Sequence, residues 1–286
     1  MIADFPSSLR RIFLFSHLYL ACCAGALYLH TLSLCGKSLH LTPSLMVLMA
    51  ATVVYYNFHK LSYRLDSIAP AHLWKSLTDP SVRVADRILF LFGGATFMFC
   101  FLKLSVALKL AWCAMTACAL LYSVPLLAFT GLRRLREIPS VKSALVAAVW
   151  ATVTGVFPLL EDASFSAEPG PWFMFFSRFA LVFALCVPFE IRDQNREQAR
   201  NLPSVMQFGR SRVIAAAAVL LLTAATVQLL SFIDDRLPLN AFISLLIPGL
   251  TAAVLMLVTR PTWPGWYFKL VVDGVMLLPL VLLILA

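Results

Sequence analysis

The chain has 286 residues, of which 61% are hydrophobic and only 13% are charged. A soluble domain is about half apolar and about a quarter charged, so this composition excludes an ordinary soluble domain and predicts a polytopic membrane protein. The formal net charge of +9 does not indicate nucleic-acid binding, because the basic residues fall in short loops between apolar runs.

Nine segments are long and apolar enough to be predicted as membrane-spanning helices, each of which needs about 20 mostly apolar residues. They are 12–30, 41–58, 87–103, 107–129, 142–160, 171–190, 213–233, 239–258 and 267–285. The first is interpreted as a spanning helix and not as a cleaved signal peptide. We therefore expect an all-α membrane bundle of about nine helices that forms one domain over residues 1–286.

The cysteines add no second kind of site to this picture. The seven Cys residues lie almost all inside the apolar segments, without metal-ligand spacing or a secreted disulfide pattern. We interpret them as small apolar residues.

The distribution of Lys and Arg predicts the orientation of the chain in the membrane. With nine spans, 18 of the 23 Lys and Arg residues fall on the side that holds the N-terminus, and four fall on the other side. The N-terminus is therefore expected inside and the C-terminus outside, in the cytoplasmic (inner) membrane. The two longest charged loops, after the second and sixth spans, both lie on the predicted cytoplasmic side.

A dense cluster of charges directly follows the sixth apolar run. Glu190, Asp193 and Glu197 recur at helical spacing, which places the three carboxylates on one face of a helix, and Arg192 and Arg196 lie between them. Carboxylates of this kind suit Mg²⁺, and arginines suit phosphate oxygens. The pattern also fits an interfacial helix end with internal salt bridges, and the spacing alone leaves both readings open.

Two further polar stretches lie at predicted cytoplasmic ends of spans. The second span ends with Asn57, Lys60 and Arg64, and the fourth is followed by Tyr122, Arg133, Arg136 and Lys142. These residues are candidates for an anion-holding surface, or else interfacial polar residues and the usual positive charge of cytoplasmic loops. Arg178 and Asp273 lie inside spans, where charged groups are costly and are kept mainly for function.

Taken together, these features resemble the UbiA superfamily of membrane prenyltransferases. The resemblance is carried by Tyr56-Asn57 in span two, by the stretches 122–126, 136–142 and 149–151, by 189–193 with Leu202-Pro203 and Gly209, and by Asp273-Gly274 in span nine. It implies nine transmembrane helices with a cytoplasmic active site built from two acidic motifs. It also implies that Mg²⁺ at these motifs holds a polyprenyl diphosphate, whose prenyl chain is transferred to an aromatic or other acceptor.

The sequence departs from the family pattern most at the first acidic motif. If Asn57 begins that motif, its three Asp positions fall on Phe58, Leu61 and Leu65. In the second motif Glu190 replaces the leading Asp, so Mg²⁺ is expected at one site at most. The resemblance implies that Asp193, Glu190 and Glu197 are the metal-binding and catalytic residues. The expected substrate-binding residues are Asn57, Lys60, Arg64, Tyr122, Arg133, Arg136, Lys142, Arg192 and Arg196.

The sequence favours a membrane prenyltransferase that uses a polyprenyl diphosphate or another isoprenoid lipid at the cytoplasmic face. The alternative is a non-catalytic isoprenoid-binding, lipid-binding or scaffold protein of the same fold, and a transporter is less favoured. The expected partners are the lipid bilayer and the isoprenoid, with no nucleic acid. Geometrically, we expect Asn57 and Asp193 to face each other across one cytoplasm-facing cavity, with Tyr122 and Lys142 nearby.

Overall fold

The computed structural model describes residues 17–65, 80–123, 138–161, 170–199 and 205–285, and all regular elements in these ranges are helical. The α-helices are α2 (Leu18–Leu34), α3 (Pro43–Leu65), α5 (Pro80–Leu102), α6 (Val106–Ser123), α7 (Pro139–Ala151), α8 (Phe157–Leu160), α9 (Pro171–Ala199), α10 (Arg210–Ile233), α11 (Leu239–Val258) and α12 (Leu278–Leu285). Short π or 3₁₀ segments are η3 (Thr152–Val156), η4 (Val205–Phe208), η5 (Tyr267–Val272) and η6 (Asp273–Leu277). The predicted all-α class is confirmed.

The helices are apolar enough for an integral membrane protein. Within the described ranges, six helical stretches have the length and hydropathy of a membrane span, and three shorter apolar helices accompany them, at Leu18–Leu34, Pro43–Phe58 and Val106–Tyr122. Each of the nine predicted segments overlaps one of these stretches. The number of nine spans itself stays a prediction, because the shorter helices fall below the usual spanning length.

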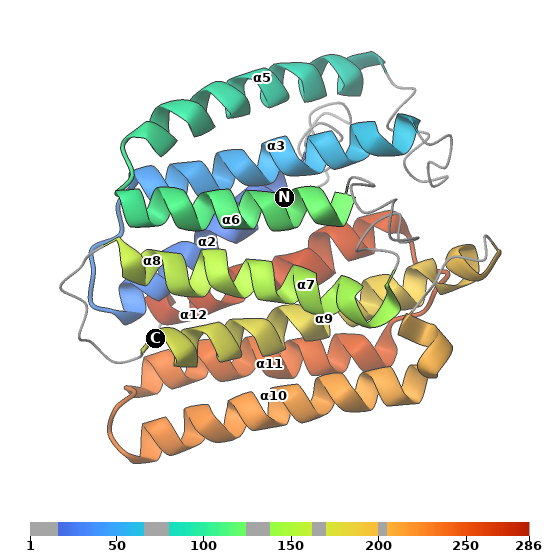
Figure 1. Cartoon of the computed structure of the whole chain (residues 1–286). Coiled ribbons are helices and arrows are strands. Elements are labelled where there is room, and N and C mark those ends of the chain that lie inside the picture. The colour runs from blue at the N-terminus through green and yellow to red at the C-terminus, as the bar shows by residue number, and fades with distance from the viewer. Residues whose placement is uncertain (1–16, 66–79, 124–137, 162–169, 200–204, 286) are drawn as a thin grey trace.

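The helices lie side by side as one bundle (Figure 1). Helix α3 packs closely along α5, α7 packs along α9, and α9 also contacts α10 and α11. Helices α3, α6 and α9 end at the same end of the bundle, where α7 and α10 begin (Figure 1). This end carries charged stretches that are predicted to lie on the cytoplasmic side.

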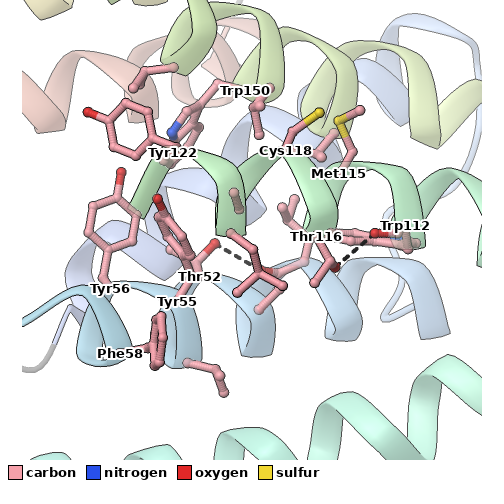
Figure 2. Close-up of a pocket in the computed structure, with 18 of the residues that line it drawn as sticks. Thr52, Tyr55, Tyr56, Phe58, Trp112, Met115, Thr116, Cys118, Tyr122 and Trp150 are labelled. Carbon is pink, nitrogen blue, oxygen red and sulfur yellow. Dashed lines mark hydrogen bonds between the residues drawn. The ribbon is translucent and has the colours of Figure 1, made fainter. Parts of the chain in front are cut away.

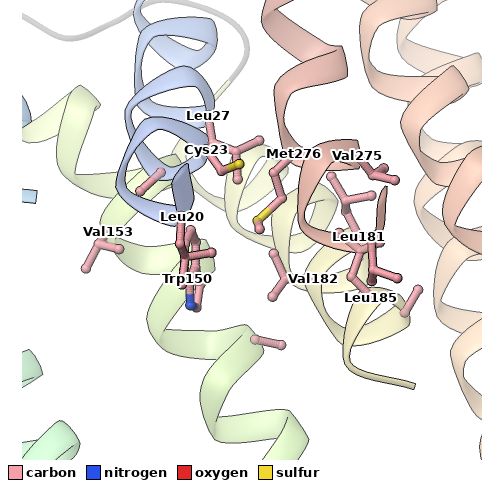
Figure 3. Packing of buried hydrophobic residues seen from close by; sticks show 14 of the residues in the cluster. Leu20, Cys23, Leu27, Trp150, Val153, Leu181, Val182, Leu185, Val275 and Met276 are labelled. Atoms are coloured by element: carbon pink, nitrogen blue, oxygen red, sulfur yellow. The ribbon is translucent and has the colours of Figure 1, made fainter. Parts of the chain in front are cut away.

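The centre of the bundle is a core of small and branched apolar side chains (Figure 3). Cys23, Ala24 and Leu27 of α2 are completely buried, because small residues allow neighbouring helices of a membrane protein to approach closely. Trp150, Leu181 and Met276 bring α7, α9 and η6 to the same core. Side chains from four distant parts of the sequence therefore fix the position of the polar end described below.

Two spans are interrupted by irregular helix, and in one of them the cause is visible in the sequence. Pro158 has no backbone N–H to donate to the carbonyl of Thr154, four residues earlier. The chain winds as a π-helix over Thr152–Val156, and the Thr154 carbonyl accepts a hydrogen bond from Thr31 Oγ1 of α2 at 2.8 Å. The other interruption, η5 and η6, carries Asp273 in the last span.

Candidate functional site

An apolar cavity of about 310 Å³ lies between α3, α6 and α7 (Figure 2). Its wall consists of Leu48, Ala51, Thr52, Val54, Tyr55, Tyr56, Phe58, Phe97, Trp112, Met115, Thr116, Cys118, Ala119, Leu120, Tyr122, Leu145, Val146, Val149, Trp150 and Val153. None of these described residues is Lys, Arg, His, Asp or Glu. A cavity of this size and lining suits an apolar ligand.

The two ends of the cavity differ in polarity. Tyr55, Tyr56 and Tyr122 gather with Trp150 at the end where α3 and α6 terminate, while Trp112 lies toward the opposite end (Figure 2). Along α3 the wall runs from Leu48 to Phe58, which is about 15 Å at the rise of an α-helix. An elongated apolar molecule therefore fits with its polar end among the tyrosine hydroxyls.

Tyr56, Phe58 and Tyr122 were singled out from the sequence, but most of the other residues that line this cavity were not predicted. Its α6 wall uses Trp112, Met115, Ala119 and Tyr122, at helical spacing of three or four residues. That spacing was the feature of the sequence that could have indicated these cavity residues. It is equally typical of a helix face buried against protein, so spacing alone does not reveal an open space.

Beside the cavity, α7 and α9 are joined by an ion pair that involves two predicted site residues. Lys142 Nζ lies 3.1 Å from Glu190 Oε1, and Ser143 Oγ donates a hydrogen bond of 2.9 Å to the same oxygen. The Glu190 side chain is only 4% exposed, whereas that of Lys142 is 22% exposed. Lys142 occupies the first turn of α7, where the helix dipole disfavours a cation, so Glu190 offsets an unfavourable position.

The next turn of α9 carries a second cation–carboxylate pair. The Arg192 guanidinium donates through Nε and Nη2 to the two carboxylate oxygens of Asp193, both at 2.8 Å. The guanidinium also lies 5.1 Å from the ring centre of Phe189 and 5.0 Å from that of Phe268. Two aromatic rings and one carboxylate therefore fix its orientation.

The two predicted Mg²⁺ ligands whose side chains are described, Glu190 and Asp193, do not form a Mg²⁺ site by themselves. Glu190 and Asp193 are each held by a cation, and the described ranges contain no group of three His, Cys, Asp or Glu side chains able to hold a metal ion. Glu197 lies on α9, but the position of its side chain is outside the described part. The predicted Mg²⁺ site at Glu190, Asp193 and Glu197 stays a prediction, and no chemical step below depends on it.

The remaining predicted residues divide into two groups. Asn57 is buried in α3, and its Nδ2 donates to the Val53 carbonyl of its own helix at 2.9 Å. Among described contacts no hydrogen bond joins it to Asp193, so the predicted facing of these two residues stays untested. The predicted site residues whose side chains lie outside the described part are Lys60, Arg64, Arg133, Arg136 and Arg196.

Arg178 belongs to a different polar cluster, at the other end of the bundle. It is 1% exposed and donates to His30 Nδ1 and to the Leu27 carbonyl, the latter at 3.3 Å. His30 Nε2 in turn lies 2.8 Å from Ser244 Oγ of α11. Arg178 and Asp273, the two charges that the sequence places inside spans, are not joined by an ion pair within the described ranges, because Arg178 Nη2 donates to α2.

Two solved structures share this architecture. One is described as a UbiA homolog from Archaeoglobus fulgidus bound to GPP and Mg2+; it has a TM-score of 0.65 and 11% sequence identity over 96% of this chain and 98% of that chain. The other, an apo UbiA homolog from Aeropyrum pernix K1, has a TM-score of 0.62 and 16% identity over 94% of each chain. No family model and no curated protein matches the sequence. Over nearly its whole length, this chain has the fold of the UbiA homologues, as its sequence motifs predicted.

Proposed function

We propose that this protein binds an isoprenoid diphosphate at the cytoplasmic face and transfers its prenyl group to an aromatic or lipid acceptor. The observation that carries the proposal is the apolar cavity between α3, α6 and α7, which ends among tyrosines at the same end of the bundle as the Lys142–Glu190 pair. The isoprenoid chain occupies the cavity, and the diphosphate lies at its charged mouth. The similar structure from Archaeoglobus fulgidus holds GPP, an isoprenoid diphosphate, which supports this ligand class.

The chain's own residues act on the diphosphate by positioning and charge. Prenyl transfer needs the negative charge of the leaving diphosphate to be stabilised. Lys142 and Arg192 are the described cations nearest to Glu190 and Asp193, and Arg192 is already oriented by its stacking on Phe189 and Phe268. Further cations on the same predicted face come from Lys60, Arg64, Arg133, Arg136 and Arg196. The cavity itself excludes water from the allylic end of the chain.

A second function is favoured by one particular side chain. Phe58 lines the cavity at a position where the resemblance places a carboxylate of the first acidic motif. An apolar ring there removes a metal ligand and enlarges the apolar surface that a lipid contacts. This favours a non-catalytic isoprenoid-binding protein that keeps the cavity and lacks turnover.

The experiment measures binding and turnover separately on the protein in lipid nanodiscs. Binding of farnesyl diphosphate is compared between the wild type, Ala119→Trp, which fills the cavity from α6, and Ala117→Trp, which places the same side chain on the exposed face of that helix. We expect Ala119→Trp to weaken binding at least tenfold and Ala117→Trp to leave it within twofold. Equal binding by both variants would refute the cavity as the ligand site.

Turnover is followed by mass spectrometry of prenylated products from a pool of lipid and phenolic acceptors, with and without a chelator. Product formation that falls strongly in Asp193→Ala supports the enzyme. Binding without any consumption of the diphosphate favours the non-catalytic function. Product formation that is indifferent to the chelator assigns charge stabilisation to the cationic side chains alone.

A further inference from the structure

The last span contains a carboxylate that neither acidic motif uses. Asp273 is the first residue of η6, directly after the π-helical segment η5. Among described residues it accepts no hydrogen bond and has no ion-pair partner within 4 Å. A carboxylate within a membrane bundle is costly, and such residues mark sites of function.

Side chains of three other helices surround Asp273. Segment η6 packs against α2 and α11, and η5 packs against α9, whose Arg192 guanidinium lies 5.0 Å from the Phe268 ring centre. Tyr56 of α3 lies near the start of α2, because its ring centre is 5.2 Å from that of His17. Asp273 and Tyr56 both keep partial accessibility. A polar group that packs among helices and stays partly accessible can be reached by a ligand. Tyr56 also lines the α3–α6–α7 cavity, so its side chain contacts the proposed isoprenoid site.

The local backbone holds Asp273 in this position. Tyr19 Oη donates a hydrogen bond of 3.0 Å to the Leu270 carbonyl in η5, which ties α2 to the irregular turn. A Cβ atom at Gly274 would lie 2.6 Å from Tyr19 Oη, so only glycine lets α2 approach so closely. The interruption of the helix is therefore locked by a contact beside the carboxylate.

The charges around Asp273 select the kind of ligand group that it can bind. Lys269 lies about one turn before Asp273 in η5, and the Arg192 guanidinium lies over Phe268 of the same segment, so positive charge is already supplied and a further cation is disfavoured. A carboxylate without a hydrogen-bond donor is satisfied best by a neutral O–H group. Resting on the proposed function, we propose that Asp273 binds the hydroxyl group of a neutral, membrane-soluble acceptor and orients it beside Tyr56.

The test uses 4-octylphenol and its methyl ether, 4-octylanisole, which share a tail and a ring while only the phenol donates a hydrogen bond. Both are offered in equal amounts to the purified protein, and native mass spectrometry measures the ratio of the two complexes. A hydrogen bond to a charged group predicts a preference of about tenfold to 150-fold for the phenol. Asp273→Leu should reduce this ratio to near one, and Asp273→Asn should give an intermediate value.

Asp235→Asn, at the exposed end of α10, is the matched control and should keep the wild-type ratio. We expect the Asp273 variants to fold, because Asp273 has no described hydrogen bond to lose. If Asp273→Leu fails to fold, the ratio measured for Asp273→Asn tests the proposal. A wild type without preference, or an Asp273→Leu variant that keeps it, overturns the proposal. Farnesyl diphosphate binding is measured on the same samples: its absence in the wild type refutes the proposed function, while an Asp273-dependent preference still establishes the hydroxyl site.

Discussion

The Lys142–Glu190 pair predicts unequal losses of stability when one or the other partner is substituted. The Glu190 side chain is 4% exposed and the Lys142 side chain 22% exposed, so removing the cation leaves a carboxylate that water hardly reaches. Breaking a buried pair in this way costs about 3–5 kcal/mol. We therefore expect Lys142→Met to be strongly destabilising.

The reverse substitution should cost less. Glu190→Gln keeps an oxygen that can accept the hydrogen bond from Ser143, and Lys142 can turn its ammonium toward water because its side chain is long and partly exposed. We expect a loss of about 1–2 kcal/mol, typical of a hydrogen bond whose charge assistance is removed. In the double variant no uncompensated charge remains, so its stability should exceed that of Lys142→Met alone.

Thermal unfolding in detergent measures the four proteins. At about 2–4 °C per kcal/mol, Lys142→Met should lower Tm by about 6–20 °C and Glu190→Gln by about 2–8 °C. Arg236→Met is the control, because the Arg236–Asp234 pair is more than half exposed and 3.8 Å long, and such surface pairs contribute about 0–1 kcal/mol. The reasoning is wrong if Glu190→Gln is the more harmful single change, or if the two losses simply add.

Three further predictions concern helix packing, the buried arginine and topology. Gly274→Ala should cost about 1–3 kcal/mol of stability in thermal unfolding, because the new Cβ atom would lie 2.6 Å from the Tyr19 hydroxyl oxygen. Gly94→Ala is the control and should be neutral or slightly stabilising, because a Cβ atom there meets no atom within 4 Å. Equal effects of the two substitutions would contradict the packing. Arg178→Met should cost about 1–3 kcal/mol by leaving a buried histidine nitrogen without its donor, and an unchanged Tm would contradict this. In a cysteine-free background, Ser38→Cys and Arg212→Cys should be labelled from opposite sides of the membrane, and labelling of both from one side would refute the orientation.

Most of the fold was predictable because apolar runs of spanning length determine where helices form. Differences arise at the ends of these runs. The sixth span was expected to end at residue 190, whereas α9 continues to Ala199. Most of the residues that follow are Glu, Gln and Arg, which favour helix, and water hydrates their side chains outside the bilayer. The irregular segments η5 and η6 were not expected, since their stability depends on the approach of Tyr19 from a distant helix.

The candidate site was predictable only in part. Helical spacing correctly placed Glu190 and Asp193 on one continuous helix, α9. The partner of Glu190 is Lys142, from a helix nearly fifty residues earlier, and no local pattern specifies which cation of a basic loop turns toward the bundle. Asp273 was noticed as an intramembrane charge, but its surroundings are set by three other helices and follow only from tertiary packing.

The balance of charge at the polar end bears on the proposed chemistry. Lys142 and Arg192 are paired there with Glu190 and Asp193, so these four described groups are neutral as a set. A neutral cluster attracts a multiply charged diphosphate weakly, because a fixed carboxylate opposes each cation. The attraction must then come from the other basic residues of the predicted cytoplasmic segments, such as Arg133 and Arg136, or from a cation that arrives with the substrate. Neutral surroundings suit a hydroxyl group better than a diphosphate, in agreement with the hydroxyl-binding role proposed for Asp273.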